Sequence, residues 1–353
     1  MSRALDVVIP VVDIQPFLSG GDGQSLSDAC KEVARSLQQY GVIIIKDPRV
    51  TEADNDVFVD MMERYYEQPN EFKKEDERPE LHYQVGVTPS TKERARDHCQ
   101  RFRNDANMDM PVTVCPPGAD PKWRYFWRVG ERPAETSFAS LNAEQVVPAR
   151  FPEWPSVMDR WGSLMLDAVK ATARMAAIGF GLPDDTFASY LEFGPHLLAP
   201  TGSDLSRHNA IGTAFASVHY DLNFLTIHGR SRFPGLFIWL RDGRRVMVRV
   251  PPNCLLLQAG KQFEWLTGGE VLAGFHEVVV CDATLDAVAA AKSAGRSLWR
   301  VSSTLFSHVA SDRTLQPLVG FPQTTDKYPP VLAGAQVQDE LRAIKLADDR
   351  QDA

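Results

Sequence analysis

Features that would mark a membrane or secreted protein are missing from this chain of 353 residues. No apolar run approaches the length needed to span a bilayer, and the first residues lack the apolar segment of a signal peptide. We therefore expect a soluble, cytoplasmic protein with no membrane partner.

An excess of basic residues is also missing. Lys and Arg number 38 against 46 Asp and Glu, which gives a formal net charge of -8. Nucleic-acid binding draws much of its affinity from clustered basic side chains that neutralise phosphates. The sequence therefore argues against a nucleic-acid partner.

Cysteine is scarce as well: the chain has five, an odd number, and no C-x-x-C pair. This usage favours free thiols in a reducing compartment over a disulfide framework or a zinc site. Internal repeats and low-complexity segments are absent, apart from a charged C-terminal tail. Because 44% of the residues are hydrophobic, the chain can bury a sizeable core, and we expect one large domain.

Helical signals gather in the first half of the chain. Residues 25–28 have the spacing of a capping box, and Gly41 lies where a glycine that ends a helix is expected. A second helix is predicted over residues 52–66, with Thr51 as its N-cap, and a longer one over residues 156–178. These helices would support whatever core the second half forms.

Strand signals dominate from Pro195 onward, where short β-like runs alternate with turn residues, and residues 241–244 give a hairpin turn signal. Helices first and strands later predict an α+β chain with a mostly β core, a double-stranded β-helix (jelly roll) with supporting N-terminal and central helices. We divide the chain into an N-terminal helix and strand region (1–150), a jelly-roll core with its support helix (151–335) and a charged tail (336–353).

The most informative motif is His219-Tyr220-Asp221. Side chains two residues apart on a strand share a face, so His219 and Asp221 can bind one cation while Tyr220 faces away. His276 follows far enough along the chain for several strands to intervene before a second imidazole reaches the same spot. Two imidazoles and one carboxylate leave other metal positions open, as in the facial triad of non-haem Fe(II) oxygenases. We therefore predict His219, Asp221 and His276 as the metal ligands of a catalytic site.

Arg300 and Ser302 repeat the same two-residue spacing in a later apolar stretch. A guanidinium offers a planar fork of two donors, and a hydroxyl adds one more, so the pair suits a carboxylate. The distal carboxylate of 2-oxoglutarate is such a group. Arg300 and Ser302 are therefore the predicted co-substrate-binding residues.

Together these residues resemble the signature of the 2-oxoglutarate- and Fe(II)-dependent dioxygenases, specifically the isopenicillin N synthase-like branch. Further segments are similar to strand and turn positions of that branch: residues 9–13, 41–45, 67–73, 224–227, 234–238 and 266–269. The resemblance implies an oxidoreductase with a jelly-roll fold that uses Fe(II), 2-oxoglutarate and O₂. It would hydroxylate, desaturate or cyclise a small organic molecule and release succinate and CO₂.

The chain departs from the family pattern at several positions. Lys261 stands where an acidic residue is usual, and Glu277 stands where an arginine usually follows the second histidine. Leu198-Ala199-Pro200 replaces an aromatic-Pro element that places a tyrosine near the co-substrate in many relatives. Residues 282–297 form an additional alanine-rich stretch, which we expect to be an inserted helix or flap.

Alternatives remain open at this stage. A lone H-x-D is often a satisfied His–Asp pair, an oxidase of this branch can work without 2-oxoglutarate, and a jelly-roll module can keep a metal without catalysis. Substrate identity and oligomeric state are not encoded in any motif. Three further histidines are expected to be structural or exposed, namely His208, His228 and His308. One basic cluster precedes the core. Such a cluster is usually a solvent-exposed face, but it also allows an anionic substrate. Its members are Lys92, Arg94, Arg96, Arg101 and Arg103.

Overall fold

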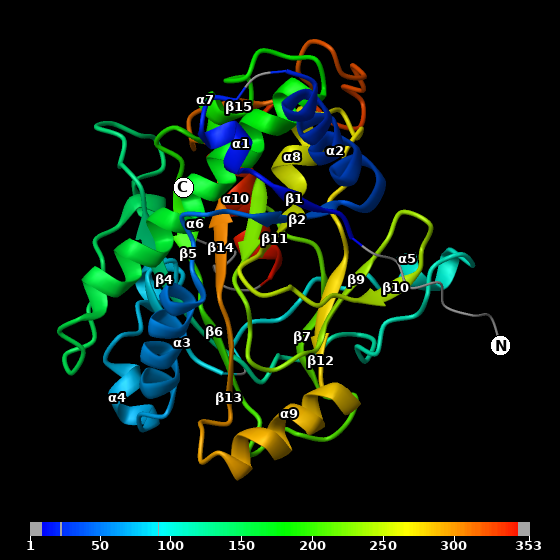
Figure 1. Cartoon of the computed structure of the whole chain (residues 1–353). Coiled ribbons are helices and arrows are strands. Elements are labelled where there is room, and N and C mark those ends of the chain that lie inside the picture. The colour runs from blue at the N-terminus through cyan, green and yellow to red at the C-terminus, as the bar shows by residue number, and fades with distance from the viewer. Residues whose placement is uncertain (1–8, 22, 91, 345–353) are drawn as a thin grey trace.

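The computed structural model describes residues 9–21, 23–90 and 92–344, and its centre consists of two facing β-sheets (Figure 1). The larger sheet has ten strands. In spatial order nine of them are β1 (Val11–Asp13), β2 (Val42–Lys46), β11 (Leu255–Ala259), β8 (Leu225–His228), β14 (Thr304–Ser307), β5 (His196–Leu198), β4 (Trp123–Val129), β6 (Thr201–Asp204) and β13 (Trp299–Ser302), and β3 (Gly86–Thr88) pairs with β4.

The smaller sheet has four antiparallel strands in the order β10 (Arg245–Met247), β9 (Leu236–Trp239), β12 (His276–Val279) and β7 (Ala214–His219). A separate pair joins β15 (Thr314–Leu315) to β16 (Val331–Leu332). Residues 240–244 turn between β9 and β10, which confirms the predicted hairpin. The two sheets give the jelly-roll core that the sequence predicts.

Helices surround this core (Figure 1). They are α1 (Gln15–Leu18), α2 (Gln24–Tyr40), α3 (Glu52–Tyr66), α4 (Asn70–Lys74), α5 (Cys99–Asn104), α6 (Trp154–Gly179), α7 (Ala188–Leu191), α8 (Lys261–Leu266), α9 (Asp282–Ser293) and α10 (Ala333–Ala343), with 3₁₀ turns at Pro79–Leu81 and Ala139–Asn142. In the described ranges, none of them has both the length and the apolarity that a bilayer crossing requires.

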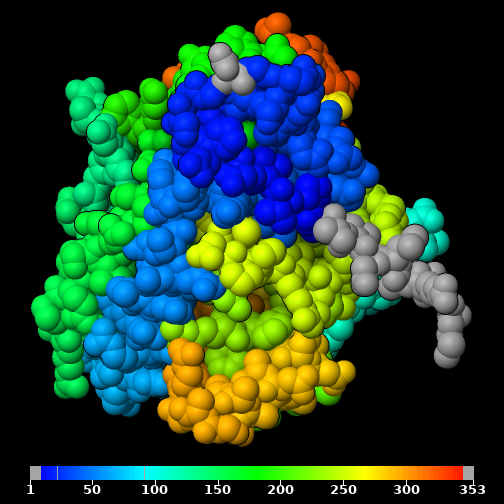
Figure 2. Space-filling model, viewed as in Figure 1, coloured from blue at the N-terminus to red at the C-terminus, as the bar shows by residue number. Residues whose placement is uncertain are grey.

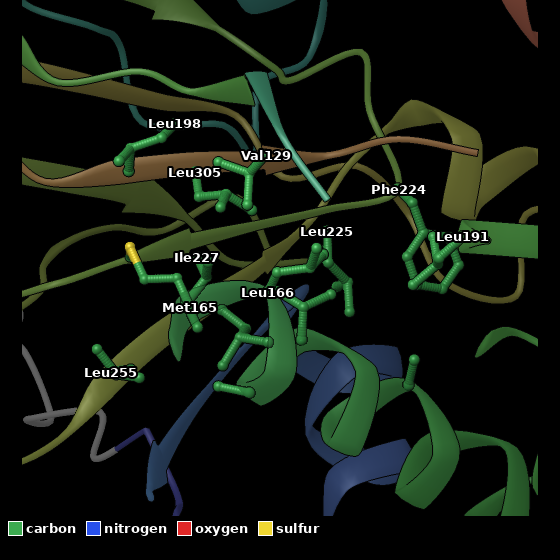
Figure 3. Close-up of a cluster of buried hydrophobic side chains, with 14 of the residues drawn as sticks. Val129, Met165, Leu166, Leu191, Leu198, Phe224, Leu225, Ile227, Leu255 and Leu305 are labelled. Atoms are coloured by element: carbon green, nitrogen blue, oxygen red, sulfur yellow. The ribbon is translucent and has the colours of Figure 1, made fainter. Parts of the chain in front are cut away.

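The long helix α6 supports the larger sheet, with α2 and α3 packed beside it. Figure 3 shows Met165 and Leu166 of this helix beside Leu225 and Ile227 of β8 and Leu305 of β14. All five side chains are buried. On β8, Leu225 and Ile227 alternate with Thr226 and His228. One face of this strand therefore packs on helices, and the other faces the interior of the barrel.

Local helix signals were mostly correct. Thr51 caps α3, because its hydroxyl accepts from the backbone N–H of Asp54 at 3.2 Å while Asp54 accepts from the Thr51 N–H. Gly41 ends α2 with φ 71°. The predicted capping box at residues 25–28 is wrong, because α2 already begins at Gln24 after Gly23 and has no side-chain cap.

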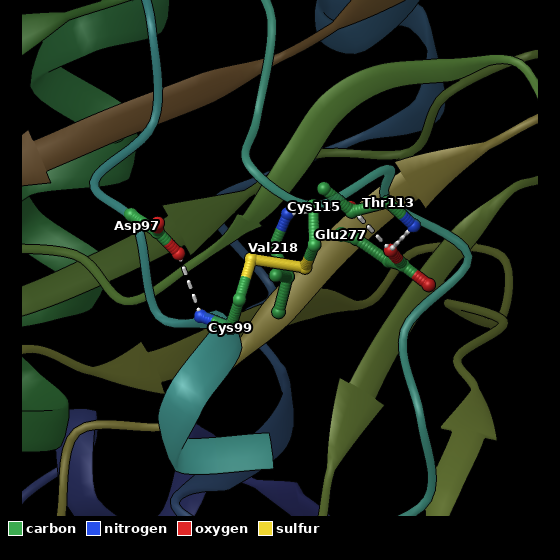
Figure 4. The surroundings of a disulfide bond; sticks show 6 residues. All are labelled: Asp97, Cys99, Thr113, Cys115, Val218 and Glu277. Atoms are coloured by element: carbon green, nitrogen blue, oxygen red, sulfur yellow. Dashed lines mark hydrogen bonds between the residues drawn. A yellow bond between two sulfur atoms is a disulfide. The ribbon is translucent and has the colours of Figure 1, made fainter. Parts of the chain in front are cut away.

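The cysteine prediction needs a correction. Cys99 and Cys115 form a disulfide with a Cα–Cα distance of 5.8 Å (Figure 4), so the chain does not hold five free thiols. Cys30, Cys254 and Cys281 are free. The pair lies outside any spacing motif, and only the folding of the segment between the two cysteines brings them together.

The prediction of a helix in the inserted stretch is confirmed. The inserted stretch forms α9, which lies at the periphery and packs Val288 into a small apolar cluster with Phe233 and Val280 (Figure 1). The segment expected as a charged tail from residue 336 begins inside α10. There Val337 and Leu341 are buried, whereas Asp339 on the same helix is exposed.

Candidate metal centre and co-substrate pocket

Strand pairing brings the three predicted ligands together. His219 ends β7 and pairs directly with His276, the first residue of β12. Nε2 of His219 and Nε2 of His276 each lie 3.7 Å from Oδ1 of Asp221. One donor atom from each of the three residues lies within 4.8 Å of the others. Within the described residues no other group of His, Cys, Asp or Glu has this arrangement.

Each ligand is held from the side away from the cluster. Nδ1 of His219 lies 2.7 Å from the carbonyl oxygen of Ser217, and Nδ1 of His276 lies 2.8 Å from the amide nitrogen of Gln258. The hydroxyl of Thr226 donates to Oδ2 of Asp221 at 2.6 Å. Contacts of this kind fix the orientation of metal ligands before the metal arrives.

The electrostatics suit a divalent cation. Burial, helped by the neighbouring His276, lowers the pKa of His219 to about 3, so the ring is neutral and its Nε2 lone pair is free. For Asp221, burial acts to raise the pKa, but His276, His219 and the Thr226 hydrogen bond outweigh it and the pKa is lowered. Two neutral imidazoles and one carboxylate are the donor set of a non-haem Fe(II) site.

A cavity of about 350 Å³ opens from these ligands toward Arg300 and Ser302. Figure 2 shows a hollow on this face, bordered by the yellow-green part of the chain that supplies residues 229–236 and 248–250. Arg300 is 5% exposed, donates through Nη1 to Oγ of Ser302 at 2.5 Å and through Nε to the Phe233 carbonyl at 3.1 Å. Burial lowers its pKa to about 10, which leaves the guanidinium charged at neutral pH.

No acidic side chain of the described ranges forms an ion pair with Arg300. A buried cation without a counter-ion is costly, so the cavity favours an anionic ligand at this end. A dicarboxylic 2-oxo acid that chelates a metal at one end would place its other carboxylate at the Arg300 end of the cavity. The residues present therefore fit both Fe(II) and 2-oxoglutarate.

A second chamber of about 100 Å³ adjoins the first cavity at His219 and Asp221, which line both. The N-terminal region and α10 wall it with apolar side chains and a buried ionic network. Lys122 binds Glu93 at 3.1 Å and Asp120 at 2.9 Å, and Arg124 binds Glu93 at 3.0 Å. Burial opposes ionisation of Glu93, but Arg124 and Lys122 prevail and lower its pKa to about 2.

Only part of the predicted basic cluster reaches this chamber. Arg94 and Arg96 line it, and Arg96 also approaches Glu340 of α10 at 3.0 Å. Lys92, Arg101 and Arg103 do not line it. Arg124, which the sequence did not single out, is a deeper cation than any of these, with its side chain 12% exposed.

The unusual residues noted in the sequence have structural roles. Glu277 is fully buried, pairs with Arg245 at 2.7 Å and accepts from the backbone N–H groups of Val112 and Thr113. Lys261 pairs with Glu264 at 2.7 Å. Neither side chain joins the ligand cluster.

The other histidines divide into three situations. His208 is exposed, as expected, and His308 is buried beside the second chamber. His228 lines the cavity that contains Arg300 and Ser302. This placement differs from the structural or exposed position expected for His228. Its position two residues after Thr226 on one strand is the signal that could have placed it inside the barrel.

Two family models match the sequence. Residues 9–153 match the non-haem dioxygenase in morphine synthesis N-terminal family, and residues 193–309 match the 2OG-Fe(II) oxygenase superfamily. The second match contains both pairs of motif residues and His276. Among curated proteins, none matches this chain.

Solved structures share the fold across almost the whole chain. A 2OG-Fe(II) oxygenase family protein from Caulobacter crescentus is 21% identical, covers 96% of this chain and 99% of its own, and superposes with a TM-score of 0.72. A full-length Neurospora crassa protein solved in complex with alpha-KG is 17% identical, covers 97% of this chain and 98% of its own, and superposes with a TM-score of 0.74. A rice dioxygenase for auxin oxidation is 14% identical, covers 95% of this chain and 95% of its own, and superposes with a TM-score of 0.64.

The two matched segments, the jelly-roll fold and the three converging ligands agree with one another. The presence of the N-terminal dioxygenase region places the chain in the branch that the sequence motifs resemble. This protein therefore belongs to the 2OG-Fe(II) oxygenase superfamily, as an oxidoreductase whose cofactors are Fe(II) and 2-oxoglutarate.

Proposed function

We propose that the protein hydroxylates a small organic molecule at the expense of 2-oxoglutarate and O₂, with release of succinate and CO₂. The observation that carries the proposal is the buried guanidinium of Arg300, which has no anionic partner in the described chain and faces a cavity that ends at the three ligands. A cavity with a cation at one end and a metal triad at the other is built for a chelating dicarboxylate.

Each residue then has a defined part. His219, Asp221 and His276 would hold Fe(II), and the Nδ1 contacts of the two histidines fix the orientation of both imidazoles. Arg300 and Ser302 bind the distal carboxylate of the co-substrate and so orient its 2-oxo end toward the metal. The iron centre supplies the oxidising power for C–H cleavage, while the protein binds, orients and excludes water.

We place the substrate in the second chamber, because the metal ligands His219 and Asp221 line it whereas Arg300 does not. Phe126, Phe306 and Leu341 supply apolar wall, which suits a compact carbon skeleton. Nε of Arg124 and Nδ2 of Asn223 are buried there without hydrogen-bond partners in the described residues. Both are donors, so we infer a substrate that carries an acceptor group such as a carboxylate or a carbonyl.

The test measures succinate release by the Fe(II)-loaded protein across a panel of arylacetic acids, pyrimidines and terpenoid acids, each acid paired with its primary amide. Pyrimidines belong in the panel because the Neurospora crassa relative is solved with thymine. Succinate formed in proportion to a hydroxylated product supports the proposal. Oxidation of a panel compound without succinate would instead identify an oxidase that needs no 2-oxoglutarate.

A matched pair of variants separates enzyme from binding module. Arg300→Leu removes the buried cation, whereas Arg249→Leu removes an exposed arginine at the rim of the same cavity. We expect Arg300→Leu to form no succinate, either with a substrate or in the slower reaction that consumes 2-oxoglutarate without one. Arg249→Leu should form succinate as the parent does. If the parent protein binds Fe(II) but consumes no 2-oxoglutarate and oxidises no panel compound, it is a non-catalytic metal-binding module.

A further inference from the structure

His228 lies on the inner face of β8 and lines the cavity that also contains the metal ligands and Arg300. On this strand Leu225 and Ile227 pack into the core, so Thr226 and His228 face the interior. Thr226 already contacts the ligand Asp221. Inward positions two residues apart on a strand are separated by about 7 Å. His228 therefore lies about that far along β8 from Thr226, the residue that contacts Asp221.

The ring is close to the other end of the cavity as well. His228 pairs in register with Thr304 of β14, the strand that follows Arg300 and Ser302. The charges of both Asp221 and Arg300 act on its imidazole. His228 therefore lines the same cavity as the metal ligands and Arg300, and the co-substrate would occupy this cavity.

One nitrogen of this imidazole has a partner and the other has none. Nδ1 lies 3.1 Å from the hydroxyl of Thr304, whereas Nε2 is buried without a hydrogen-bond partner in the described residues. Burial lowers the pKa of His228 to about 4, so the ring is neutral at physiological pH. When the Thr304 hydroxyl donates to Nδ1, the single ring proton is on Nε2, where it is a free donor.

The cavity needs such a donor. Arg300 already directs Nη1 to Ser302 and Nε to the Phe233 carbonyl, which leaves only part of its fork for a ligand. A carboxylate has about four lone-pair positions to satisfy. The element Leu198-Ala199-Pro200 offers no side-chain donor either.

We propose that His228 is a third co-substrate contact, in which its Nε2–H donates to the distal carboxylate of 2-oxoglutarate. This inference rests on the proposed function, since it needs 2-oxoglutarate in the Arg300 cavity. His228 is a binding residue and takes no part in proton transfer. The contact gives the buried Nε2 of His228 a hydrogen-bond partner and adds no charge to the cavity.

The test titrates the anaerobic Fe(II)-loaded protein with 2-oxoglutarate, followed by calorimetry and by the charge-transfer absorption of the chelate. His228→Leu is expected to weaken 2-oxoglutarate about ten-fold or more, because a hydrogen bond to a charged group is lost. His228→Gln keeps a donor of similar reach and should restore most of the affinity. Fe(II) affinity should match the parent in both variants, and so should all values for His208→Leu, which changes an exposed histidine.

A second ligand locates the contact. 2-Oxobutyrate has the same metal-chelating end but no distal carboxylate, so its affinity should be the same in His228→Leu and in the parent. Equal weakening of both ligands would overturn the assignment to the distal carboxylate. If His228→Leu does not fold, Thr304→Val replaces it: loss of the hydroxyl that orients the ring should give a smaller, still ligand-selective loss.

The failures of the two proposals are distinguishable. A parent protein that does not bind 2-oxoglutarate contradicts the proposed function itself. A parent that binds it, together with a folded His228→Leu variant of unchanged affinity, contradicts only the role of His228.

Discussion

His219 and His276 occupy directly paired positions on the antiparallel strands β7 and β12, and their ring centroids lie 4.2 Å apart. The sheet therefore builds most of the metal centre, because a paired position delivers the second imidazole from a distant part of the sequence. Asp221 completes the cluster from just beyond the end of β7.

Removal of any one ligand should abolish iron binding. For His219→Ala, Asp221→Ala and His276→Ala we expect no stoichiometric Fe(II) binding and no turnover, since each variant loses one of only three protein ligands. The fold should persist, because each side chain lies at a strand end in the barrel interior. Fe(II) titration combined with circular dichroism checks this, with His208→Ala as the control; full iron occupancy in a ligand variant would refute the assignment.

The disulfide should stabilise the segment that supports both ligand strands. Thr113 beside Cys115 donates to Glu277 and accepts from the Val218 N–H, next to His276 and His219 respectively (Figure 4). The separation between the two cysteines is 16 residues, and a loop of this length corresponds to about 3 kcal/mol of unfolding free energy.

We therefore expect the double variant Cys99→Ser, Cys115→Ser to lose about 3 kcal/mol in urea unfolding monitored by fluorescence. Its Fe(II) affinity should also decrease, because the ligand strands lose part of their outer support. Cys281→Ser, which changes a free cysteine, is the control. Unchanged stability of the double variant under oxidising conditions would show that the disulfide contributes nothing.

Acidification should destabilise the protein through its buried histidines. Burial lowers the pKa of His308 to about 3, from an ordinary value of 6.5. Between these values the unfolded chain binds a proton that the folded chain does not, so stability rises with pH and is lost progressively as the pH falls from 6.5 toward 3. His219 and His228 add to this loss, because their pKa values are lowered in the same direction.

His308→Leu should flatten the dependence by about one proton, or about 1.4 kcal/mol per pH unit inside that window. Urea unfolding of parent and variant between about pH 7.5 and about pH 4.5 measures the difference in slope. Parallel curves for the two proteins would mean that His308 titrates normally in the folded state.

The inserted helix α9 should be dispensable for the metal. It lies at the periphery, contributes no member of the ligand cluster and packs on the core through the buried Thr284 and Val288. Replacement of residues 285–295 by a short linker should leave Fe(II) affinity unchanged and lower stability, because Phe233 and Val280 lose apolar cover. Complete loss of metal in a folded deletion variant would contradict this placement.

Local patterns in the sequence were sufficient for the parts of the site that depend on neighbouring residues. The His219-x-Asp221 and Arg300-x-Ser302 spacings encode shared strand faces, and Thr51 encodes a helix start, because each depends on geometry within a few residues. His276 was predicted as the third ligand because several strands can intervene before it, but this spacing alone does not specify its pairing with His219.

The features that the sequence did not reveal depend on contacts between distant segments. Cys99 and Cys115 approach only after the intervening segment folds onto the ligand strands. The role of His228 depends on its register with Thr304. Leu341 covers the second chamber from a segment whose charged composition resembles a solvated tail. In each case the local pattern is compatible with several tertiary neighbours, so composition and periodicity could not select one.

The central claim is that 2-oxoglutarate chelates Fe(II) at the triad with its distal carboxylate on Arg300. The most direct test is the charge-transfer absorption of the anaerobic Fe(II) complex during titration with 2-oxoglutarate. The parent should develop the band, and Arg300→Leu should need about thirty-fold to several thousand-fold more co-substrate, because a buried charged contact contributes about 2–5 kcal/mol. Ser302→Ala should cost about 1 kcal/mol, and Arg300→Lys should fall between the two. A band of undiminished affinity in Arg300→Leu, or no band in the iron-loaded parent, would contradict the account.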